Sequence, residues 1–275
     1  MPAAALSATI VTFRPDIGLL RHALSSLAGA IGYARAAGRL SSATIYVVDN
    51  GPEDARGAIE EALAQWPAEA GALELVAGHG NVGYGRANNL VLERLDSDYH
   101  LVMNPDVELE PESLDAVLRA LLGDAGLGMA APAVYGDDGQ RQYLCKRYPS
   151  LWVLFLRGFA PRRVRERFAS TLDAYEMRDV IAESPLAGIP LASGCFMLMR
   201  TEIFKRLKGF DPRFFLYFED YDLSLRIGRE SSVGYVPQSR IIHHGGEAAT
   251  KGWRHVAWFV RSAWRFFSTH GWKIA

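Results

Sequence analysis

Short apolar runs alternate with longer amphipathic segments through the first half of the chain. The apolar runs have the length of buried strands, while the segments between them repeat apolar residues every three or four positions, as helices do. The predicted strands are Ala8–Phe13, Thr44–Val48, Leu73–Ala77, His100–Met103 and Leu127–Ala131, and the predicted helices are 16–36, Glu53–Gln65, Arg86–Arg94 and Pro111–Leu122. This βαβα order predicts an α/β fold with a Rossmann-like, mostly parallel, doubly wound sheet flanked by helices.

The pattern changes in the second half. Tyr148–Glu183 mixes aromatic side chains with an arginine-rich run and has weak periodicity. Two interpretations are open: a mobile element, less ordered than the first half, near an amphiphilic or anionic ligand, or a basic, solvated helix that covers the sheet. Further on, the pattern predicts a helix, two short strands and a final long helix, at Thr201–Leu207, Val233–Val236, Arg240–His243 and Gly252–His270.

The final helix carries an apolar stripe. Trp253, Val256, Val260, Trp264 and Phe267 recur at spacings of three and four, with Arg254, Arg261 and Arg265 on another side. Such a stripe either docks on the rest of the protein or rests on an anionic membrane through its tryptophans and arginines.

Composition narrows the classes of partner. The chain has 275 residues, 49% of them hydrophobic, and its 30 basic residues nearly balance 31 acidic ones. No global field therefore favours nucleic acid. Two distant cysteines without a CxxC motif argue against a disulfide framework and fit a reducing compartment. The N-terminus lacks the basic region of a signal peptide, and no apolar run is long enough to span a bilayer. We expect a cytoplasmic protein, with contact at the inner face of the cell membrane left open.

Polar residues cluster where the predicted strands end. They are Thr12, Asp49-Asn50, the loop Asn81 to Asn89, and Asn104 to Asp106. Ligands of such sheets bind beyond the carboxyl ends of the strands. A nicotinamide-binding domain is excluded, because the first strand–helix turn contains no glycine and Gly83-Tyr-Gly85 lacks the third glycine of that motif. A Walker A lysine motif is absent as well.

These clusters suit a nucleotide-sugar site. Asp49 can accept from the N3–H of a pyrimidine, and the Asn81–Asn89 loop offers backbone amides to a diphosphate or nucleoside. Asp106 suits a hard divalent ion that bridges diphosphate oxygens, and a histidine of His243-His244 could complete its shell. Each feature also has a plain structural interpretation, as a turn former or a loop shaped by glycine.

Three carboxylates follow an aromatic run near the start of another predicted helix. Phe215 to Phe218 precede Glu219, Asp220 and Asp222, and Leu223, Leu225 and Ile227 continue at spacing that suits a buried helix side. An apolar wall and a helix N-terminus suit a general base, although acids also simply cap helices. Adjacent helical residues point about 100° apart, so Glu219 and Asp220 cannot both reach one hydroxyl. Asp222 could pair with Arg226 four residues on.

In order, these motifs resemble the inverting family 2 glycosyltransferases of the GT-A fold, and most of all bacterial rhamnosyltransferases of cell-surface polysaccharide synthesis. The resemblance runs from about Ala8 to Gly246. The motifs are Val11-Thr12-Phe13, Asp49-Asn50, Asn81-Val-Gly-Tyr-Gly85 with Asn88-Asn89, Leu101-Val-Met-Asn-Pro-Asp106, Ala192-Ser-Gly194, Gly209-Phe-Asp211, Phe218-Glu-Asp-Tyr-Asp-Leu-Ser-Leu-Arg226 and His243-His-Gly-Gly246.

The resemblance implies a role for each residue. Asp220 would be the catalytic base, with Glu219 and Asp222 as candidates that orient the acceptor. Asp106 and His243 would bind Mn²⁺ or Mg²⁺, although Asn104 replaces the first acid of the usual Asp-x-Asp motif and is a weaker ligand. The nucleotide-sugar contacts would be Thr12, Asp49, Asn81, Gly83, Asn88, Asn104, Ser193 and Gly194.

It also implies the partners and the domain organisation. A dTDP- or UDP-sugar would be the donor, dTDP-rhamnose being favoured by the resemblance alone, and a glycan or lipid-linked glycan would be the acceptor. One domain would span 1–275: a nucleotide-sugar half (1–132), a smaller acceptor and catalytic half (133–250) and the amphipathic helix (251–275). A nucleotidyltransferase and a non-catalytic nucleotide-sugar-binding protein are the alternatives.

Overall fold

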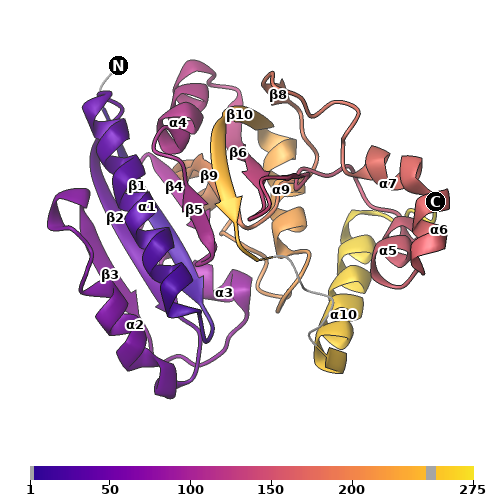
Figure 1. Cartoon of the computed structure of the whole chain (residues 1–275), viewed down its shortest axis with the longest axis horizontal. Helices are drawn as coiled ribbons and strands as arrows, with labels where there is room; N and C mark the ends of the chain where they lie inside the picture. Colours follow the sequence, from indigo (N-terminus) through magenta and orange to yellow (C-terminus); the bar gives the residue numbers. More distant parts are fainter. Residues whose placement is uncertain (1–2, 246–251) are drawn as a thin grey trace.

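The protein is built on one sheet with helices on both faces (Figure 1). The computed structural model describes residues 3–245 and 252–275. The strands are β1 Ala4–Thr12, β2 Leu40–Asp49, β3 Ala72–Val76, β4 Tyr99–Met103, β5 Val107–Leu109, β6 Leu127–Tyr135, β7 Arg141–Gln142, β8 Leu186–Ala187, β9 Phe196–Arg200 and β10 Ser232–His243. The helices are α1 Ile17–Ala36, α2 Arg56–Leu63, α3 Tyr84–Asn89, α4 Ser113–Gly123, α5 Leu151–Gly158, α6 Arg162–Arg167, α7 Ala169–Tyr175, α8 Thr201–Arg206, α9 Glu219–Glu230 and α10 Gly252–His270.

The sheet is mixed, and most of its long strands run one way. Its order is β3-β2-β1-β4-β9-β6-β10-β5, with β7 beside β6 and β8 beside β10. Strands β1, β2, β3 and β4 pair in parallel, and β10 pairs in parallel with β6. Strand β9 lies antiparallel between β4 and β6. The predicted, mostly parallel α/β sheet is confirmed. The sequence pattern did not predict the antiparallel strand β9.

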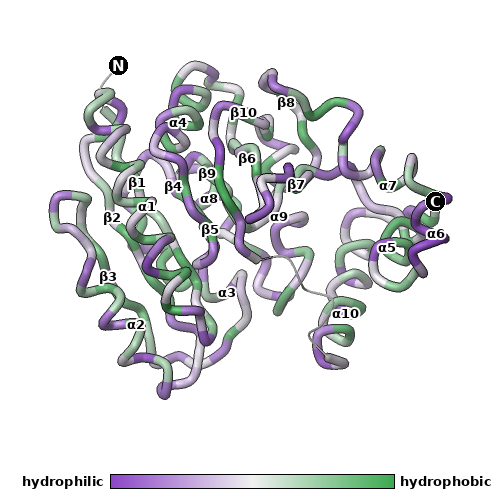
Figure 2. The backbone as a smooth tube through the Cα atoms, viewed as in Figure 1, coloured by the Kyte–Doolittle hydropathy of each residue, from purple (hydrophilic) through white to green (hydrophobic). Residues whose placement is uncertain are grey.

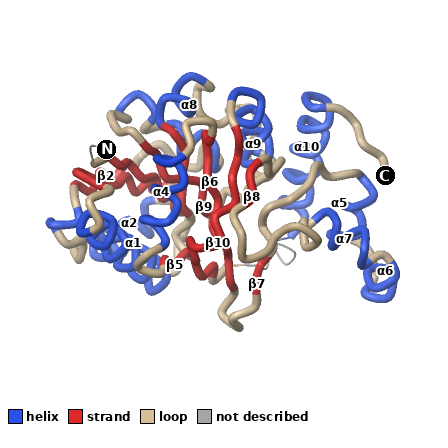
Figure 3. Tube along the Cα trace, turned by 90° about the horizontal axis from the view of Figure 1, so that it is seen from above, coloured by secondary structure: helices blue, strands red, loops and turns tan. Residues whose placement is uncertain are grey.

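Two cores form because the sheet is apolar on both faces. Helices α1, α2 and α4 cover one face, where Leu27 and Leu118 are fully buried. Helices α3, α8 and α9 cover the other, where Phe204 and Leu223 are fully buried. Figure 2 shows hydrophobic residues concentrated along the central strands between these layers, and Figure 3 shows the helices on either side of the sheet. Strands buried on both faces read as continuous apolar runs, which is why the first half was predictable.

The second half departs from the predictions in two places. The two short strands expected at Val233–Val236 and Arg240–His243 form one strand, β10, with a break in register between Val236 and Arg240. Pro237 lies in that break, where the missing N–H costs no ladder hydrogen bond. Tyr148–Glu183 forms three short helices at the α10 end of the molecule (Figures 1 and 3), so its arginine-rich helix α6 does not cover the sheet.

Helix α10 docks through a third, smaller core. Phe266 and Phe267 are fully buried against Phe214 and Phe218, which precede and begin the acidic helix α9. Ser262 adds a hydrogen bond to the Leu216 carbonyl at 2.8 Å. The aromatic run before the acids is therefore held in place by the last helix of the chain.

Candidate active site

Asp49 ends β2 with one open carboxylate oxygen. Its Oδ1 accepts from the Gly51 N–H at 3.0 Å, whereas its Oδ2 is buried without a hydrogen-bond partner. A buried acceptor is costly unless a ligand supplies a donor. Thr12 pairs with Asp49 across β1 and β2, but its hydroxyl is fully buried and donates to the Val48 carbonyl at 3.5 Å. Asp49 thus suits ligand contact, whereas Thr12 supports the strand edge behind it.

Asn50 and Asn81 tie the glycine-rich loop to the end of β2. Asn50 donates to Asn81 Oδ1 at 3.1 Å and accepts from the Val82 N–H at 2.9 Å. Gly83 adopts φ 90°, and a Cβ there would lie 2.4 Å from the Phe215 carbonyl oxygen. Gly83 is therefore required by contact between two loops. The bridging role of Asn50 was not predicted, although it stands beside Asp49 in the motif.

Two adjacent asparagines of α3, Asn88 and Asn89, donate hydrogen bonds to backbone carbonyls. Asn88 is fully buried and donates to the Tyr84 carbonyl at 3.0 Å. Asn89 donates to the Phe210 carbonyl at 2.7 Å and accepts from the Phe210 N–H at 2.9 Å. Among the described residues, Asn88 Oδ1 is buried without a hydrogen-bond partner, and its contact with the nucleotide sugar stays a prediction. Asn89 fastens the Gly209–Phe210 turn to α3.

Tyr84, which was not predicted as a site residue, connects the end of β4 to the turn before β9. Its hydroxyl shares one proton between Asn104 Oδ1 at 3.0 Å and the Gly194 carbonyl at 2.9 Å. Burial, and next the nearby charge of Glu219, hold the pKa of Tyr84 well above its usual value. The Asn104 N–H donates to the Cys195 carbonyl at 3.0 Å. The end of β4 and the turn before β9 are thereby fixed side by side.

The acidic helix α9 begins from an unusual backbone. Tyr217 and Phe218 both lie in the left-handed region, with φ of 71° and 65°. Each such residue costs on the order of 1–3 kcal/mol and persists only where packing enforces it. Here Phe218 is buried against α10, and the Tyr217 hydroxyl lies 2.9 Å from His255 Nδ1. This backbone aims the first carboxylates of the helix.

Asp220 faces the turn before β9. Its Oδ2 accepts from the Gly194 N–H at 2.9 Å, and its Oδ1 accepts from the Tyr221 N–H at 2.9 Å. Burial raises the pKa of Asp220, while the hydrogen bond from Gly194 opposes the rise. The carboxyl is only partly buried, so it keeps acceptor capacity on its open side. Ser193 is turned to its own loop, where its Oγ accepts from the Cys195 N–H at 3.3 Å.

Glu219 is a buried acid without a charge partner. It is 5% exposed, and its Oε2 has no hydrogen-bond partner. Burial, and next the charge of Asp220, raise the pKa of Glu219 to about 8. The raised pKa of Glu219 favours the protonated carboxyl near neutral pH, and a protonated carboxyl can donate a hydrogen bond.

Asp222 is a structural acid in this conformation. Its Oδ2 pairs with Arg226 Nε at 2.7 Å, as its spacing suggested, and its Oδ1 lies 2.8 Å from His270 Nε2. The side chains of Asp222 and His270 are each 1% exposed. Both oxygens are engaged within the protein, and the acceptor-orienting role of Asp222 stays a prediction. Asp222 clasps α9 to α10.

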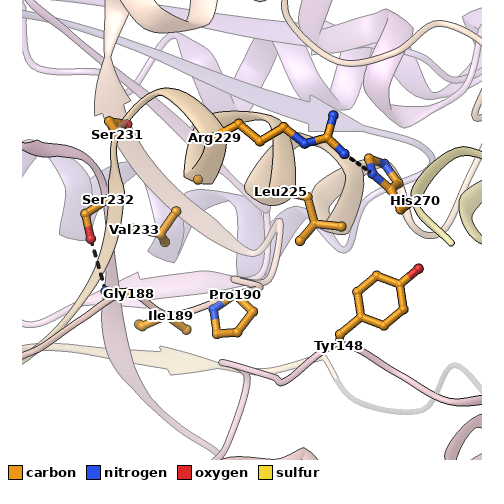
Figure 4. A pocket seen from close by; sticks show the side chains of 11 residues that line it. Tyr148, Gly188, Ile189, Pro190, Leu225, Arg229, Ser231, Ser232, Val233 and His270 are labelled. Atoms are coloured by element: carbon orange, nitrogen blue, oxygen red, sulfur yellow. Dashed lines mark hydrogen bonds between the residues drawn. The ribbon is translucent and has the colours of Figure 1, made fainter. Parts of the chain in front are cut away.

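The clasp continues into a cavity that is separate from the acids. His270 Nδ1 lies 3.0 Å from Arg229, and both residues line a cavity of about 490 Å³ with Tyr148, Leu225 and the segment 188–190 (Figure 4). Arg229 lies in the last turn of α9, at the other end from Glu219 and Asp220. None of the predicted site residues lines this cavity.

Asp106 and His243 could hold a divalent ion. Asp106 Oδ1 is buried without a hydrogen-bond partner among residues 3–245 and 252–275, and it lies 3.7 Å from His243 Nε2. His243 Nδ1 lies 3.2 Å from Gln142 Oε1, which leaves Nε2 facing the carboxylate. Burial lowers the pKa of His243, which favours the neutral imidazole that metals bind. Gln142 is the orienting residue that the sequence did not reveal.

The neighbouring residues support this choice of histidine. His244 contacts Asp137 and Glu108, and so points away from Asp106. At Gly245 a Cβ would lie 2.2 Å from Asp106 Oδ2, so the backbone closes tightly over that carboxylate. Gly246, the last residue of the motif, lies outside the described residues. Within the described residues no group of three His, Cys, Asp or Glu side chains could hold a metal, so a bound ion would need further oxygens from a ligand.

Comparison with known proteins decides the family. The glycosyl transferase family 2 model matches residues 10–208. The chain belongs to that family. It is 30% identical over 217 residues to the N-acetylglucosaminyl-diphospho-decaprenol L-rhamnosyltransferase of Mycobacterium tuberculosis, covering 73% of this chain and 66% of that protein. It therefore spans slightly less than two thirds of that relative's length. It is 24% identical to rhamnosyltransferase WbbL of Escherichia coli, covering 71% of this chain and 74% of WbbL.

Solved structures confirm the GT-A fold. The mannosyltransferase PcManGT from Pyrobaculum calidifontis, in complex with GDP-Man and Mn²⁺, superposes with a TM-score of 0.61 at 17% identity, over 95% of this chain and 61% of PcManGT. GalNAc-T7 with UDP, GalNAc and Mn²⁺ superposes with a TM-score of 0.62 at 15% identity, over 90% of this chain and 44% of GalNAc-T7. At 15–17% identity these neighbours show the fold of the chain alone. Across the described residues, no helix combines the length and apolarity needed to cross a bilayer.

Proposed function

We propose that this glycosyltransferase inverts configuration as it moves a sugar, L-rhamnose first among the candidates, from a nucleoside diphosphate to a hydroxyl of a glycan or lipid-linked glycan. The observation that carries the proposal is the position of Asp220, a partly exposed acid held against Gly194 while Asn104 is held against the adjoining Cys195. This arrangement supports a site in which Asp220 would face the acceptor and Asp106 would face the donor.

The donor would lie along the strand ends. Asp49 Oδ2, now without a partner, would accept from the N3–H of thymine or uracil. A dTDP- or UDP-sugar is the expected donor, and rhamnose is favoured by the names of the relatives from Mycobacterium tuberculosis and Escherichia coli. The Asn50–Asn81 bridge would keep the adjoining loop in position for the nucleoside.

Transfer would be one displacement. The acceptor hydroxyl attacks the anomeric carbon, its oxygen forms the new C–O bond, and the bond to the diphosphate breaks on the opposite side. Asp220 takes the hydroxyl proton as the bond forms, a step typically worth about 10²–10⁴-fold. Protonated Glu219 would donate a hydrogen bond that orients the acceptor. Mn²⁺ or Mg²⁺ held by Asp106 and His243 would supply positive charge to the leaving diphosphate.

The acceptor and location belong to the same proposal. The Mycobacterium tuberculosis relative is named for a decaprenol-linked diphosphate sugar, which supports a lipid-linked acceptor in cell-surface polysaccharide synthesis. We place the reaction in the cytoplasm at the inner face of the cell membrane, where such an acceptor would meet a nucleotide sugar.

The test is a donor screen followed by product analysis. Nucleotide sugars are first ranked by the rise in melting temperature that they cause with Mn²⁺ present. The best donor is then incubated with acceptor glycans, and the released nucleotide and the anomeric configuration of the product are determined by NMR. Free nucleoside diphosphate and an inverted linkage are expected. A retained configuration would overturn the assignment of Asp220 as the base.

A further inference from the structure

Helix α10 has a second apolar face that docking leaves uncovered. Its buried side is formed by Ala263, Phe266 and Phe267. A neighbouring stripe stays in solvent, with Trp253 78%, Val256 47%, Val260 56% and Trp264 66% exposed. Of the five residues of the predicted stripe, Phe267 docks and the other four stay exposed. Helices on globular surfaces usually bury their apolar stripe, so the exposed one calls for a partner.

The exposed stripe continues beyond the helix. The Trp264 ring contacts Trp272, which is 49% exposed. The following residues pair with the start of α5: the Leu151 N–H donates to the Lys273 carbonyl, and the Trp152 N–H donates to the Ile274 carbonyl. Helix α5 then adds its own exposed stripe, with Leu151 38%, Phe155 45% and Phe159 57% exposed. The ring contact and the two backbone hydrogen bonds thus connect one apolar surface across α10, the C-terminal residues and α5.

The exposed apolar area of this surface is larger than that of isolated apolar side chains on a protein surface. At about 250 Å² for a tryptophan, the exposed fractions of Trp253, Trp264 and Trp272 together leave on the order of 500 Å² in solvent. That value already equals the largest apolar patch of a typical monomer, before phenylalanine, valine and isoleucine are added.

Basic residues surround this surface. From Gly252 to Ala275 the chain contains Arg254, Arg261, Arg265 and Lys273 and no acidic residue. The arginines of α10 lie roughly 100° round the helix from its exposed stripe. Helix α6 adds four arginines and one glutamate, and among the described residues only Arg162 of these arginines has an acidic partner, Glu166. The whole chain has a net charge of −1, so this positive charge is local.

We propose that the surface formed by α10, the C-terminal residues, α5 and α6 binds an anionic lipid membrane. Its tryptophans and aliphatic side chains would enter the boundary between headgroups and acyl chains, and its arginines would face lipid phosphates. The absence of acidic residues from α10 favours this partner over a second copy of a chain that is nearly neutral overall. The inference rests on the proposed function, because a lipid-linked acceptor would lie in that membrane.

The clasp described above connects this surface to the catalytic acids. Asp222 and His270 join α9 to α10 through side chains that are both 1% exposed. A membrane that fixes α10 would therefore also fix α9, whose first turn carries Asp220. Membrane contact and acceptor presentation would share one rigid unit.

Vesicle sedimentation of the full chain tests the proposal without any transfer activity. We expect wild type to bind phosphatidylcholine vesicles that contain phosphatidylglycerol, and to bind pure phosphatidylcholine vesicles weakly. Trp253→Ser with Trp264→Ser should reduce binding at least about tenfold, since two large interfacial anchors are lost. Arg162→Gln, Arg163→Gln and Arg165→Gln together should reduce binding only to the anionic vesicles. Tyr33→Ser, an exposed aromatic on α1, is the matched control and should bind like wild type.

Donor binding and transfer to a soluble acceptor are measured on the same variants. Normal vesicle binding without transfer would refute the proposed function and leave the surface assignment standing. Normal transfer by a wild type that ignores anionic vesicles would refute the surface assignment alone. A wild-type dimer that the tryptophan variant dissociates, with no vesicle binding, would instead assign the surface to self-association and overturn the proposal.

Discussion

Single substitutions of two acids in α9 should affect transfer activity and folding stability separately. Asp220 and Asp222 are two residues apart in one helical turn, yet Asp220 accepts backbone N–H groups whereas Asp222 binds Arg226 and His270. We predict that Asp220→Asn loses activity but little stability. We predict the reverse for Asp222→Ala, which should lose stability first.

The size of each effect follows from the contacts. Removing one partner of a buried ion pair costs about 3–5 kcal/mol. The Arg226 side chain remains 19% exposed, so we expect the lower end, about 3 kcal/mol, for Asp222→Ala. At roughly 2–4 °C per kcal/mol, its melting temperature should fall by about 6–12 °C. Asp220→Asn keeps one oxygen and so loses either the Gly194 or the Tyr221 hydrogen bond, worth about 1 kcal/mol, and its melting temperature should fall by about 2–4 °C, less than for Asp222→Ala.

Activity should show the opposite order. Loss of the general base should lower the transfer rate of Asp220→Asn by about 10²–10⁴-fold. Asp222→Ala should keep most of its rate at a temperature well below its melting point. The assay combines thermal unfolding followed by circular dichroism with initial rates of nucleoside diphosphate release at saturating donor. Glu230→Gln, at the far end of α9, is the control: it breaks a largely exposed ion pair with Arg206, so the rate should stay unchanged and the melting temperature should fall by about 4 °C or less.

Two results would contradict these roles for Asp220 and Asp222. If Asp222→Ala melts like wild type but loses activity 100-fold, the ion pair does not stabilise the fold, and Asp222 must be assigned as the catalytic base. If Asp220→Asn retains more than a tenth of the wild-type rate, the assignment of Asp220 is wrong whatever its stability.

Three further predictions concern the metal and the buried acid. Asp106→Ala should abolish the difference in donor affinity between Mn²⁺ and EDTA, measured by calorimetry. The control Glu108→Ala should preserve that difference. An unchanged metal effect in Asp106→Ala would exclude Asp106 as a metal ligand. Gly245→Ala should weaken metal-dependent donor binding with little change in melting temperature, because its Cβ would displace Asp106 Oδ2; normal binding would contradict this crowding. The raised pKa of Glu219 means that the native state binds more protons than the unfolded state between about pH 4.5 and pH 8, so stability should fall as pH rises through that window. Glu219→Gln should flatten the decline in urea unfolding free energy, and an unaltered slope would show that other groups cause it.

Much of the fold could be predicted because its signals are local. Strands β1, β2 and β4 are buried on both faces, so each appears as an apolar run with a polar residue at its end. Parallel strands then bring those ends to one edge, which is why Asp49 and Asn104 could be assigned to one site. The antiparallel position of β9 could not be predicted, because pairing with β4 and β6 depends on contacts between segments about 65–100 residues apart.

The roles of individual polar residues depended on tertiary neighbours. Spacing predicted that Asp222 could meet Arg226, but only packing with α10 brings His270 to the other oxygen. Asn88 and Asn104 looked alike in the sequence as strand-end or loop amides. Asn88 is buried and donates to the Tyr84 carbonyl, whereas Asn104 accepts from the Tyr84 hydroxyl beside Gly194.

By itself the sequence determined the α/β class, the strand ends that carry the site, and the order of motifs that identified the family, since these depend on residue type and local spacing. The tertiary structure alone decided which carboxylate stays open, which histidine faces Asp106, and which face of α10 is buried. The physical reason is that burial and hydrogen-bond partners set the protonation and accessibility of a side chain, and those partners come from segments distant in the chain. Helix α10 illustrates this, because its spacing allows two neighbouring apolar stripes and only the aromatic residues before α9 select the one that docks.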